Sequence, residues 1–274
     1  MKAWHDIMRR VLEEGEVRSD RTGVGTISLF GLSAEFENTP TSFPAVTTKK
    51  LAVKQCFGEM AAFIRGYDNL ADFHALDCTI WDANAHAEYW EPRTEGDLGR
   101  IYGVQWRSWI TEGNGLGSVD QLAKLVHTLK FNPTSRRHLV TAWNPGELGD
   151  MCLPPCHTHF QCYVSEGKYL DLQVYMRSVD LFLGLPFDVA GYALLQRLIA
   201  SETNLVSRRL VFSLGDAHIY KNHVDQVKLV LSREPLPAPE LYMPSDIGLF
   251  DFMPGFVELG SYQHYGAVAA EMAV

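Results

Sequence analysis

One stretch near the middle of the chain decides the fold: Phe160-Gln161-Cys162-Tyr163-Val164-Ser165-Glu166-Gly167-Lys168-Tyr169-Leu170-Asp171-Leu172-Gln173-Val174-Tyr175-Met176. Its two ends, Phe160–Val164 and Leu170–Met176, are rich in the β-branched and aromatic residues that strands favour. Between them, Glu166-Gly167-Lys168 has the composition of a tight turn. The stretch therefore predicts a hairpin of two adjacent strands.

The rest of the chain mixes strand-like runs with helical segments. Further strand-like runs are Thr26–Phe30, Leu139–Trp143 and Leu210–Leu214. The segments with helical apolar spacing are Leu51–Gly66, Val119–Phe131 and Ala190–Ala200, the last apolar on nearly all faces. Because these elements do not alternate regularly, we expect an α+β fold rather than a doubly wound sheet. No linker or repeat divides the sequence, so residues 1–274 are predicted to form a single domain.

The composition is that of a globular protein with an acidic balance. The 274 residues are 46% apolar and 21% charged, which excludes a disordered or fibrous chain. There are 24 Lys and Arg against 33 Asp and Glu, a net charge of −9. This balance argues against a protein that coats nucleic acid, since phosphate backbones attract a basic surplus. It still permits a small phosphorylated ligand held by a few arginines.

The cysteines and the apolar runs bear on the cellular compartment. The chain has five cysteines, and an odd count in a long chain suits a reducing compartment better than a disulfide framework. The first residues do not read as a signal peptide, and no run approaches the ~18 apolar residues of a membrane span. We expect a cytoplasmic protein without membrane contact, from a bacterial cell or a phage-infected host.

A candidate nucleophile lies in the segment Leu153-Pro154-Pro155-Cys156-His157-Thr158-His159. Two prolines restrict the backbone before Cys156, and the strand that follows would place the sulfur at a strand edge facing a cleft. Taken alone, the segment fits a buried structural cysteine beside two structural histidines better than it fits a nucleophile. A zinc site formed by Cys152, Cys156, His157 and His159 is weaker, because four ligands within eight residues do not match usual zinc spacing.

Arginines beside hydroxyl groups predict a phosphate site. The chain contains Ser135-Arg136-Arg137, Arg177-Ser178 and Asp20-Arg21-Thr22-Gly23. The guanidinium group offers a planar fork of donors that suits phosphate oxygens, and nearby arginines also stabilise a thiolate. Each pair alone could be a solvated surface feature. Together they indicate a mononucleotide phosphate site.

Several acids and rings lie where chemistry would need them. Glu59 falls on the apolar side of a predicted helix, which suggests a paired or catalytic carboxyl group. Asp188 sits between Phe187 and Val189, where a carboxyl group is either paired or has a raised pKa, or caps the helix expected near Ala190. His218 and Tyr220 face one side of an extended segment, as a sugar-binding pair would.

The sequence resembles the thymidylate synthase family from about Trp4 to Val274, with the motifs in the family's order and at its spacing. The motifs are Asp20-Arg21-Thr22-Gly23, Phe43-Pro44-Ala45-Val46-Thr47-Thr48-Lys49-Lys50, Ile80-Trp81-Asp82-Ala83-Asn84, Gly96-Asp97-Leu98-Gly99, Tyr102-Gly103-Val104-Gln105-Trp106, Pro154-Pro155-Cys156-His157, Gly215-Asp216-Ala217-His218-Ile219-Tyr220 and Glu271-Met272-Ala273-Val274. The resemblance implies one catalytic domain with a large twisted mixed sheet, helices on one face, and a homodimer formed through the sheets.

The resemblance also implies a role for individual residues. Cys156 would add to C6 of a pyrimidine nucleotide, and the implied catalytic set is Cys156, Glu59, Asp188, Tyr102 and His157. The implied nucleotide-binding residues are Arg21, Arg177, Ser178, Asp180, Asp188, His218 and Tyr220, with Arg136 and Arg137 contributed by the partner subunit. The implied residues for methylenetetrahydrofolate, the co-substrate, are Lys49, Trp81, Asn84, Leu153, Asp180, Gly184, Phe187 and Ala273. No metal is implied.

The main departure from the family pattern is Asp188, where thymidylate synthases have Asn after Pro-Phe. The Asn amide accepts from uracil N3–H and donates to O4, whereas cytosine presents the opposite pattern. A protonated carboxyl group matches cytosine, because one oxygen donates to N3 while the other accepts from the 4-amino group. The change from Asn to Asp marks the deoxycytidylate hydroxymethylases of this superfamily.

Smaller departures accompany it. Met176 stands where Gln is usual, Arg100 where Pro is usual, Gly191 where Ser is usual, and Gln263-His264-Tyr265 where Pro-His-Pro is usual. Met176 matches the hydroxymethylase branch, and Ser178 favours deoxyribose over ribose. We therefore expect hydroxymethylation of dCMP at C5. The alternatives are methylation of dCMP with folate as hydride donor, then thymidylate synthesis from dUMP, and last an inactive regulator that binds nucleotide or RNA.

Overall fold

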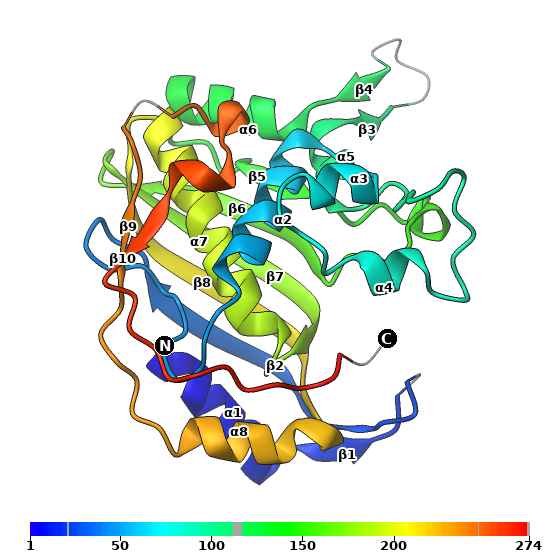
Figure 1. Cartoon of the computed structure of the whole chain (residues 1–274). Helices are drawn as coiled ribbons and strands as arrows, with labels where there is room; N and C mark the ends of the chain where they lie inside the picture. Colours follow the sequence, from blue (N-terminus) through cyan, green and yellow to red (C-terminus); the bar gives the residue numbers. More distant parts are fainter. Residues whose placement is uncertain (21, 112–116, 246, 273–274) are drawn as a thin grey trace.

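A six-stranded mixed sheet forms the centre of the molecule (Figure 1). The computed structural model describes residues 1–20, 22–111, 117–245 and 247–272. The sheet has the order β1-β2-β8-β7-β6-β5. Its strands are β1 (Glu16–Arg18), β2 (Thr26–Glu37), β5 (Leu139–Thr141), β6 (His157–Ser165), β7 (Tyr169–Asp180) and β8 (Val206–Tyr220). The large mixed sheet confirms the expected α+β class.

The remaining elements surround this sheet. Two short pairs lie apart from it, β3 (Trp109–Ile110) with β4 (Ser118–Val119), and β9 (Glu240–Tyr242) with β10 (Glu258–Gly260). The α-helices are α1 (Lys2–Glu14), α2 (Val53–Arg65), α3 (Leu70–His74), α4 (Asp82–Ala85), α5 (Tyr102–Arg107), α6 (Gln121–Phe131), α7 (Gly184–Glu202) and α8 (Val224–Leu231). Single 3-10 turns span Leu148–Asp150, Lys221–His223, Leu249–Asp251 and Pro254–Phe256. Among the described residues, no helix combines the length and apolar character that crossing a bilayer requires.

The predicted hairpin is present as β6 and β7, which pair antiparallel from His157 to Tyr169. Glu166 and Gly167 both have positive φ, 55° and 65°, and the Lys168 amide donates to the Ser165 carbonyl at 3.0 Å. Two successive residues with positive φ match the right-handed twist of the strands that they join. The turn therefore fixes the register of the pair.

The edge of the sheet that matters for function follows from the strand directions. β7 and β8 are parallel and joined by α7, so both strands end at the same edge, where Asp180 pairs with His218. β6 runs antiparallel to β7, so it begins at that edge, directly after Cys156. One edge therefore collects the residues that precede β6 and those that end β7 and β8.

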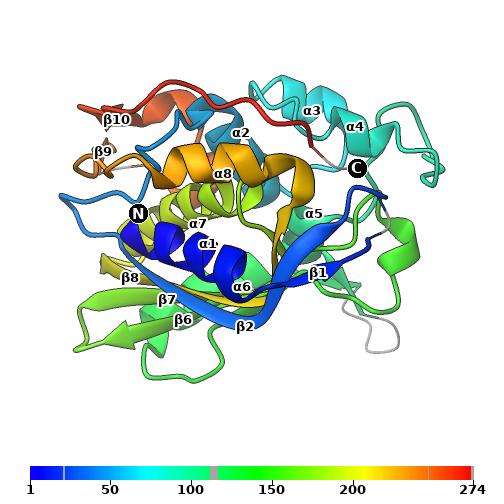
Figure 2. The ribbon, with the colours of Figure 1, turned by 90° about the horizontal axis from the view of Figure 1, so that it is seen from below.

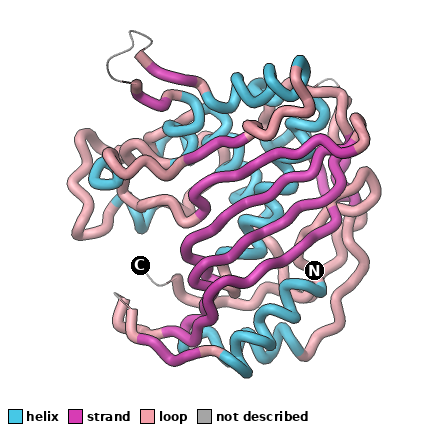
Figure 3. The backbone as a smooth tube through the Cα atoms, turned by 180° about the vertical axis from the view of Figure 1, so that it is seen from behind, coloured by secondary structure: helices cyan, strands magenta, loops and turns pink. Residues whose placement is uncertain are grey.

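Helices α2 and α7 cover one face of the sheet, and α7 is buried along most of its length, as its apolar sequence predicted (Figures 1 and 2). Figure 3 shows the opposite face of the central strands, over which no helix of the described chain passes. Large apolar side chains remain exposed in the sheet strands, Phe30 at 80% and Tyr163 at 64%. One face of the sheet is thus open in the single chain.

Two expected boundaries need correction. Helix α7 begins at Gly184 rather than near Ala190, because Pro186 falls in the first turn, where a missing backbone N–H costs no hydrogen bond. Asp188 therefore lies inside the helix, and it does not cap it. Strand β5 ends at Thr141, two residues before the predicted end at Trp143.

Helix α5 approaches α2 closely at Gly103. A methyl group added there would lie 2.4 Å from the Phe63 carbonyl oxygen and 2.5 Å from its Cα. Because those atoms belong to the backbone of a buried helix, they cannot move aside cheaply. Next to this contact, the Tyr102 ring stacks on Phe63 with centroids 4.9 Å apart.

We predict that Gly103→Ala lowers the free energy of unfolding by about 1–3 kcal/mol, the usual cost of overpacking a core. Urea denaturation followed by circular dichroism measures this. Gly149→Ala is the matched control, since an added methyl group there meets nothing within 4 Å. Equal stability of the two variants would contradict the close contact.

Candidate active site

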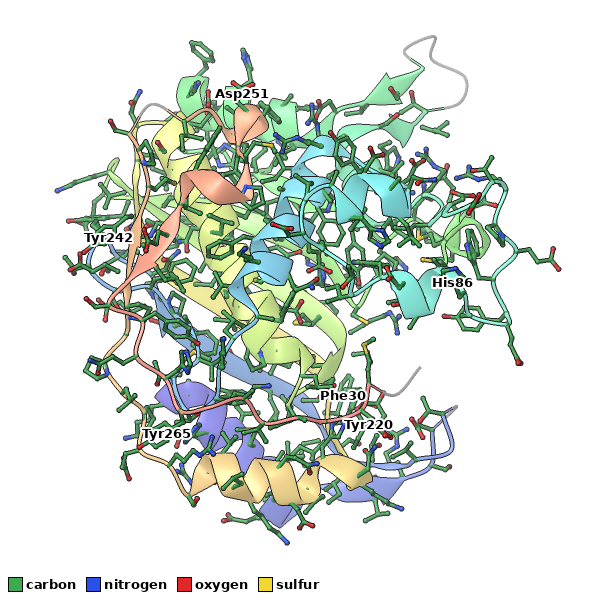
Figure 4. The ribbon with its side chains drawn as sticks, viewed as in Figure 1. Phe30, His86, Tyr220, Tyr242, Asp251 and Tyr265 are labelled. Atoms are coloured by element: carbon green, nitrogen blue, oxygen red, sulfur yellow. The ribbon has the colours of Figure 1, made fainter. Side chains whose placement is uncertain are left out.

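The site lies at the edge of the sheet where β6 begins and where β7 and β8 end. Figure 4 labels Tyr220 at the end of β8, which marks this edge. Cys156 directly precedes β6 and is half-buried, whereas Cys56, Cys78, Cys152 and Cys162 are all buried. Burial raises the pKa of the Cys152 thiol to about 12. Cys156 is thus the cysteine best placed to meet a ligand.

Arg177 holds the loop that carries Cys156. Its Nε donates to the Pro155 carbonyl at 2.9 Å and its Nη2 to the Pro154 carbonyl at 2.9 Å. Its backbone N–H donates to the Cys156 carbonyl at 2.8 Å. The sequence predicted Arg177 as a phosphate ligand, and it did not predict this second task of positioning the nucleophile loop.

Tyr102 also holds the loop that carries Cys156. Its hydroxyl oxygen accepts a hydrogen bond from the Cys156 backbone N–H at 2.7 Å. Its ring stacks on His157 with centroids 4.1 Å apart. Burial, followed by the neighbouring Cys156 charge, raises the pKa of Tyr102 well above its usual value, so the phenol is neutral. Tyr102 therefore serves as a fixed polar group that holds the backbone of Cys156.

Glu59 projects from α2 into the buried part of the site. Its Oε1 accepts from the Trp81 indole N–H at 2.8 Å. Burial raises the pKa of Glu59 to about 7, and the hydrogen bond from Trp81 partly opposes the shift. A carboxyl group poised near neutral pH can both accept and donate a proton.

Asp188 occupies the second turn of α7, and its side chain retains 16% exposure. Burial, followed by the negative charges of Glu59 and Asp180, raises the pKa of Asp188 well above its usual value. The ionised form is penalised twice, by desolvation and by like charges. These surroundings therefore favour the neutral, protonated form of the carboxyl group.

A β-bulge decides which way His157 faces. The register of β6 shifts between His157 and His159, so these two residues lie on opposite faces of the sheet. His157 stacks on Tyr102, whereas His159 stacks on Tyr175. The two histidines therefore do not converge. Among the described residues, no three His, Cys, Asp or Glu side chains gather as a metal site would require.

His157 is buried and contacts two residues of α7. Its Nδ1 lies 2.7 Å from the Tyr192 hydroxyl, and its Nε2 lies 3.7 Å from Asp188 Oδ1. Burial lowers the pKa of His157 to about 3, so the imidazole is neutral. Sequence reasoning missed Tyr192, although its position four residues after Asp188 places both on one helical face.

The predicted nucleotide-binding residues at the ends of β7 and β8 come together. Asp180 pairs with His218, and Ser178 pairs with Asp216 in the same register. The His218 ring meets Tyr220 edge-on at 5.1 Å. These residues form one polar edge beside Cys156.

Five of the residues predicted for folate lie at three places in the fold. Trp81 and Asn84 are buried at α4, Leu153 is half-buried in the nucleophile loop, and Gly184 and Phe187 lie in the first turn of α7. Asp180 Oδ1 accepts from the backbone N–H of Phe182 and of Leu183, at 2.9 and 3.1 Å.

Lys49 lies deeper than its predicted role suggests. Its ammonium group is buried, donates to the Phe182 carbonyl at 2.6 Å and lies 4.1 Å from the centre of the Phe182 ring. Burial lowers its pKa to about 8, and the Asp180 charge partly opposes the shift. The Lys49 ammonium is thus tied to the segment that begins α7. Arg21 and Ala273, also predicted for the site, lie outside the described residues.

Arg136 and Arg137 lie far from Cys156 of the same chain. Both are exposed in the loop between α6 and β5. Since Leu139 pairs with Gln161, Arg137 falls beside Tyr163, seven residues along β6 from Cys156. Seven extended residues span about 23 Å. These arginines therefore do not join the site within one chain.

A sequence model of the thymidylate synthase family matches residues 2–274. The chain belongs to the thymidylate synthase family. Enzymes of this family transfer a one-carbon unit to C5 of a pyrimidine nucleotide and use methylenetetrahydrofolate as co-substrate. In this thymidylate synthase family member, the ends of β7 and β8, the loop before β6 and the start of α7 surround Cys156.

The raised pKa of Glu59 predicts a pH dependence of stability. Because the folded state holds this proton more tightly than the unfolded state, the free energy of unfolding falls as the pH rises from about 4.5 to about 7. Glu59→Gln keeps an acceptor for Trp81 but removes this pH dependence. As the pH rises over that interval, the free energy of unfolding of the variant should therefore increase by up to about 3 kcal/mol relative to that of wild type.

Urea denaturation at pH 4.5 and pH 8 measures the difference. Glu95→Gln is the control, because Glu95 is exposed. A difference between wild type and Glu59→Gln that stays constant with pH would show that Glu59 has an ordinary pKa.

Proposed function

We propose that this family member hydroxymethylates C5 of dCMP, with methylenetetrahydrofolate as one-carbon donor and water as the source of the hydroxyl oxygen. The observation that supports the proposal is the position of Asp188 in α7, where burial and the charges of Glu59 and Asp180 raise the pKa of its carboxyl group and favour the neutral form. A neutral carboxyl group has one donor and one acceptor, which cytosine requires at N3 and at the 4-amino group.

The same carboxyl group discriminates against uracil. Uracil presents a donor at N3 and an acceptor at O4, so the group would need its proton on the other oxygen. A buried site that is built for one hydrogen-bond pattern rejects the reverse pattern strongly, because mismatched groups remain unpaired. By resemblance, Ser178 after Arg177 supports deoxyribose as the sugar, because the ribonucleotide-specific cytidylate hydroxymethylases of the superfamily carry Ala at that place.

Cys156, Asp188 and Glu59 have separate roles in the proposed reaction. The Cys156 sulfur adds to C6, and the protonated Asp188 stabilises the negative charge that this addition places on N3 and N4. C5 then becomes nucleophilic and takes the one-carbon unit that bound methylenetetrahydrofolate supplies. Loss of the C5 proton and departure of tetrahydrofolate leave an exocyclic methylene group on the base, and water adds to this group to give the hydroxymethyl substituent. Glu59, whose pKa is raised to about 7, accepts and donates protons during the reaction. Elimination of Cys156 restores the aromatic base.

We further propose a homodimer that completes the phosphate site. Arg177 and, outside the described residues, Arg21 belong to the same chain as Cys156. Arg136 and Arg137 lie about 23 Å along the sheet from Cys156, so they serve another copy's nucleotide. The open face of the sheet, with Phe30 and Tyr163 exposed, supports association through this face.

The choice between a hydroxymethyl and a methyl product depends on water. Met176 is buried in β7, and Arg100 is held by Glu147 at 2.6 Å and by the Ser108 carbonyl at 2.6 Å. These two departures from the family pattern therefore do not open the site directly. The altered stretch Gln263-His264-Tyr265 is the remaining departure that bears on the access of water. Its Tyr265 backbone N–H donates to the Thr47 carbonyl.

Methylation of dCMP is the second candidate, favoured by one observation. Trp81 is 4% exposed and held by Glu59, so an aromatic wall that could exclude water is in place. We place hydroxymethylation first because Asp188 and Met176 together match that branch of the superfamily.

We predict that Asp188→Asn shifts the ratio of kcat/KM for dCMP to kcat/KM for dUMP toward dUMP by at least about tenfold. The reason is that reversing one buried hydrogen-bond pair costs about 1–3 kcal/mol. Steady-state kinetics with both nucleotides measures the ratio. Asp72→Asn, on the exposed side of α3, is the control and leaves it unchanged. A wild-type enzyme that already prefers dUMP would end the proposal.

We also predict that dCMP yields 5-hydroxymethyl-dCMP without formation of dihydrofolate. A methylene unit plus water gives a hydroxymethyl group with no change in the oxidation state of folate, whereas a methyl group requires hydride from tetrahydrofolate. Mass spectrometry in ¹⁸O-labelled water should show one labelled oxygen in the product. Stoichiometric dihydrofolate with 5-methyl-dCMP would support the second candidate and leave the reading of cytosine intact.

A further inference from the structure

Helix α7 directs two groups at one imidazole. Asp188 and Tyr192 are four residues apart, so they lie on the same helical face, and both face His157. Tyr192 OH lies 2.7 Å from Nδ1, and Asp188 Oδ1 lies 3.7 Å from Nε2. Stacking on Tyr102, with the rings inclined at 28°, holds the plane of the imidazole.

The direction of the Tyr192 hydrogen bond follows from its surroundings. The Tyr192 side chain is 1% exposed and lies among the rings of Trp106, Phe160 and Phe212. Within the described part of the chain, the hydrogen bond recorded for its hydroxyl is the one to His157. A buried O–H without an acceptor is costly, so the phenol donates its proton to Nδ1.

The tautomer of His157 is thereby fixed. A neutral imidazole carries one N–H, and when Nδ1 accepts a hydrogen bond, that N–H resides on Nε2. The Nε2–H then faces Asp188 Oδ1. At 3.7 Å it acts on this oxygen through its dipole or through a bridging water. A donor that faces Oδ1 favours a lone pair there, so the Asp188 proton resides on Oδ2.

We propose that Tyr192 is a positioning residue that determines base specificity, by fixing the His157 tautomer and thus the oxygen of Asp188 that carries the proton. This inference rests on the proposed function. With the proton on Oδ2, Oδ1 accepts from the 4-amino group of cytosine and Oδ2 donates to N3. Uracil would need the proton on Oδ1, where it would face the Nε2–H of His157.

The tautomer is testable in the wild-type protein without any substitution. The chain has ten histidines, so uniform ¹⁵N-histidine labelling with a His157→Gln spectrum for assignment identifies the signals of His157. We expect a protonated Nε2 and an unprotonated Nδ1 at pH 7.5. A protonated Nδ1 would overturn the inference.

The effect on specificity is tested with Tyr192→Phe, which keeps the ring and removes the hydroxyl group. We expect the ratio of kcat/KM for dCMP to that for dUMP to fall about tenfold, with both His157 tautomers visible in the spectrum. Tyr262→Phe is the matched control. It also removes a phenol hydroxyl that donates a hydrogen bond, but this one goes to the Val46 backbone carbonyl, at 2.6 Å, and not to His157. An unchanged ratio in folded Tyr192→Phe would overturn the inference.

A double variant separates this role from a general packing effect. In the Asp188→Asn background the donor and acceptor atoms are set by the amide, so Tyr192→Phe should leave the ratio unchanged. An equal fall in both backgrounds would show that Tyr192 acts only through packing. A wild-type preference for dUMP would contradict the proposed function. The histidine spectrum would still test the His157 tautomer independently of that result.

Discussion

The crowding of three carboxyl groups into one poorly solvated region constrains the rest of the site. Glu59 on α2, Asp180 at the end of β7 and Asp188 on α7 are close enough for the charges of the other two to raise the pKa of Asp188. Like charges in a buried region cannot all ionise, so at least one proton must stay. The pKa of Asp188 is raised well above its usual value, which favours the proton there, and a protonated carboxyl group can both donate and accept a hydrogen bond.

The sheet explains why these groups meet. Because β7 and β8 are parallel and joined by α7, the chain passes from Asp180 directly into the helix that carries Asp188. The antiparallel β6 begins at the same edge, and its bulge turns His157 toward α7. Arg177 on β7 then holds the prolines before Cys156. Strand direction, one bulge and one guanidinium group therefore place Cys156 at the edge of the sheet where α7 carries Asp188.

Sequence reasoning predicted the hairpin, the buried helix, and the membership of Asp188, Glu59 and His157 in one site. These features depend on local composition and on family motifs, which a sequence displays directly. The start of α7 was predicted six residues too late, because Pro186 lies in the first turn of the helix, the one place in a helix where proline costs no hydrogen bond. Three features were beyond reach: the loop contacts of Arg177, the burial of Lys49 and the partner of His157. Each depends on tertiary contacts, and the bulge that orients His157 has no local signal in the sequence.

We propose that Asp188 is a neutral acid at physiological pH. Difference infrared spectroscopy of wild type against Asp188→Asn, at pH 7.5 and with dCMP bound, measures the protonation of this carboxyl group. We expect the carbonyl stretch of a protonated carboxylic acid in wild type and its absence from the variant. Carboxylate bands at Asp188 with no protonated carbonyl stretch would contradict it.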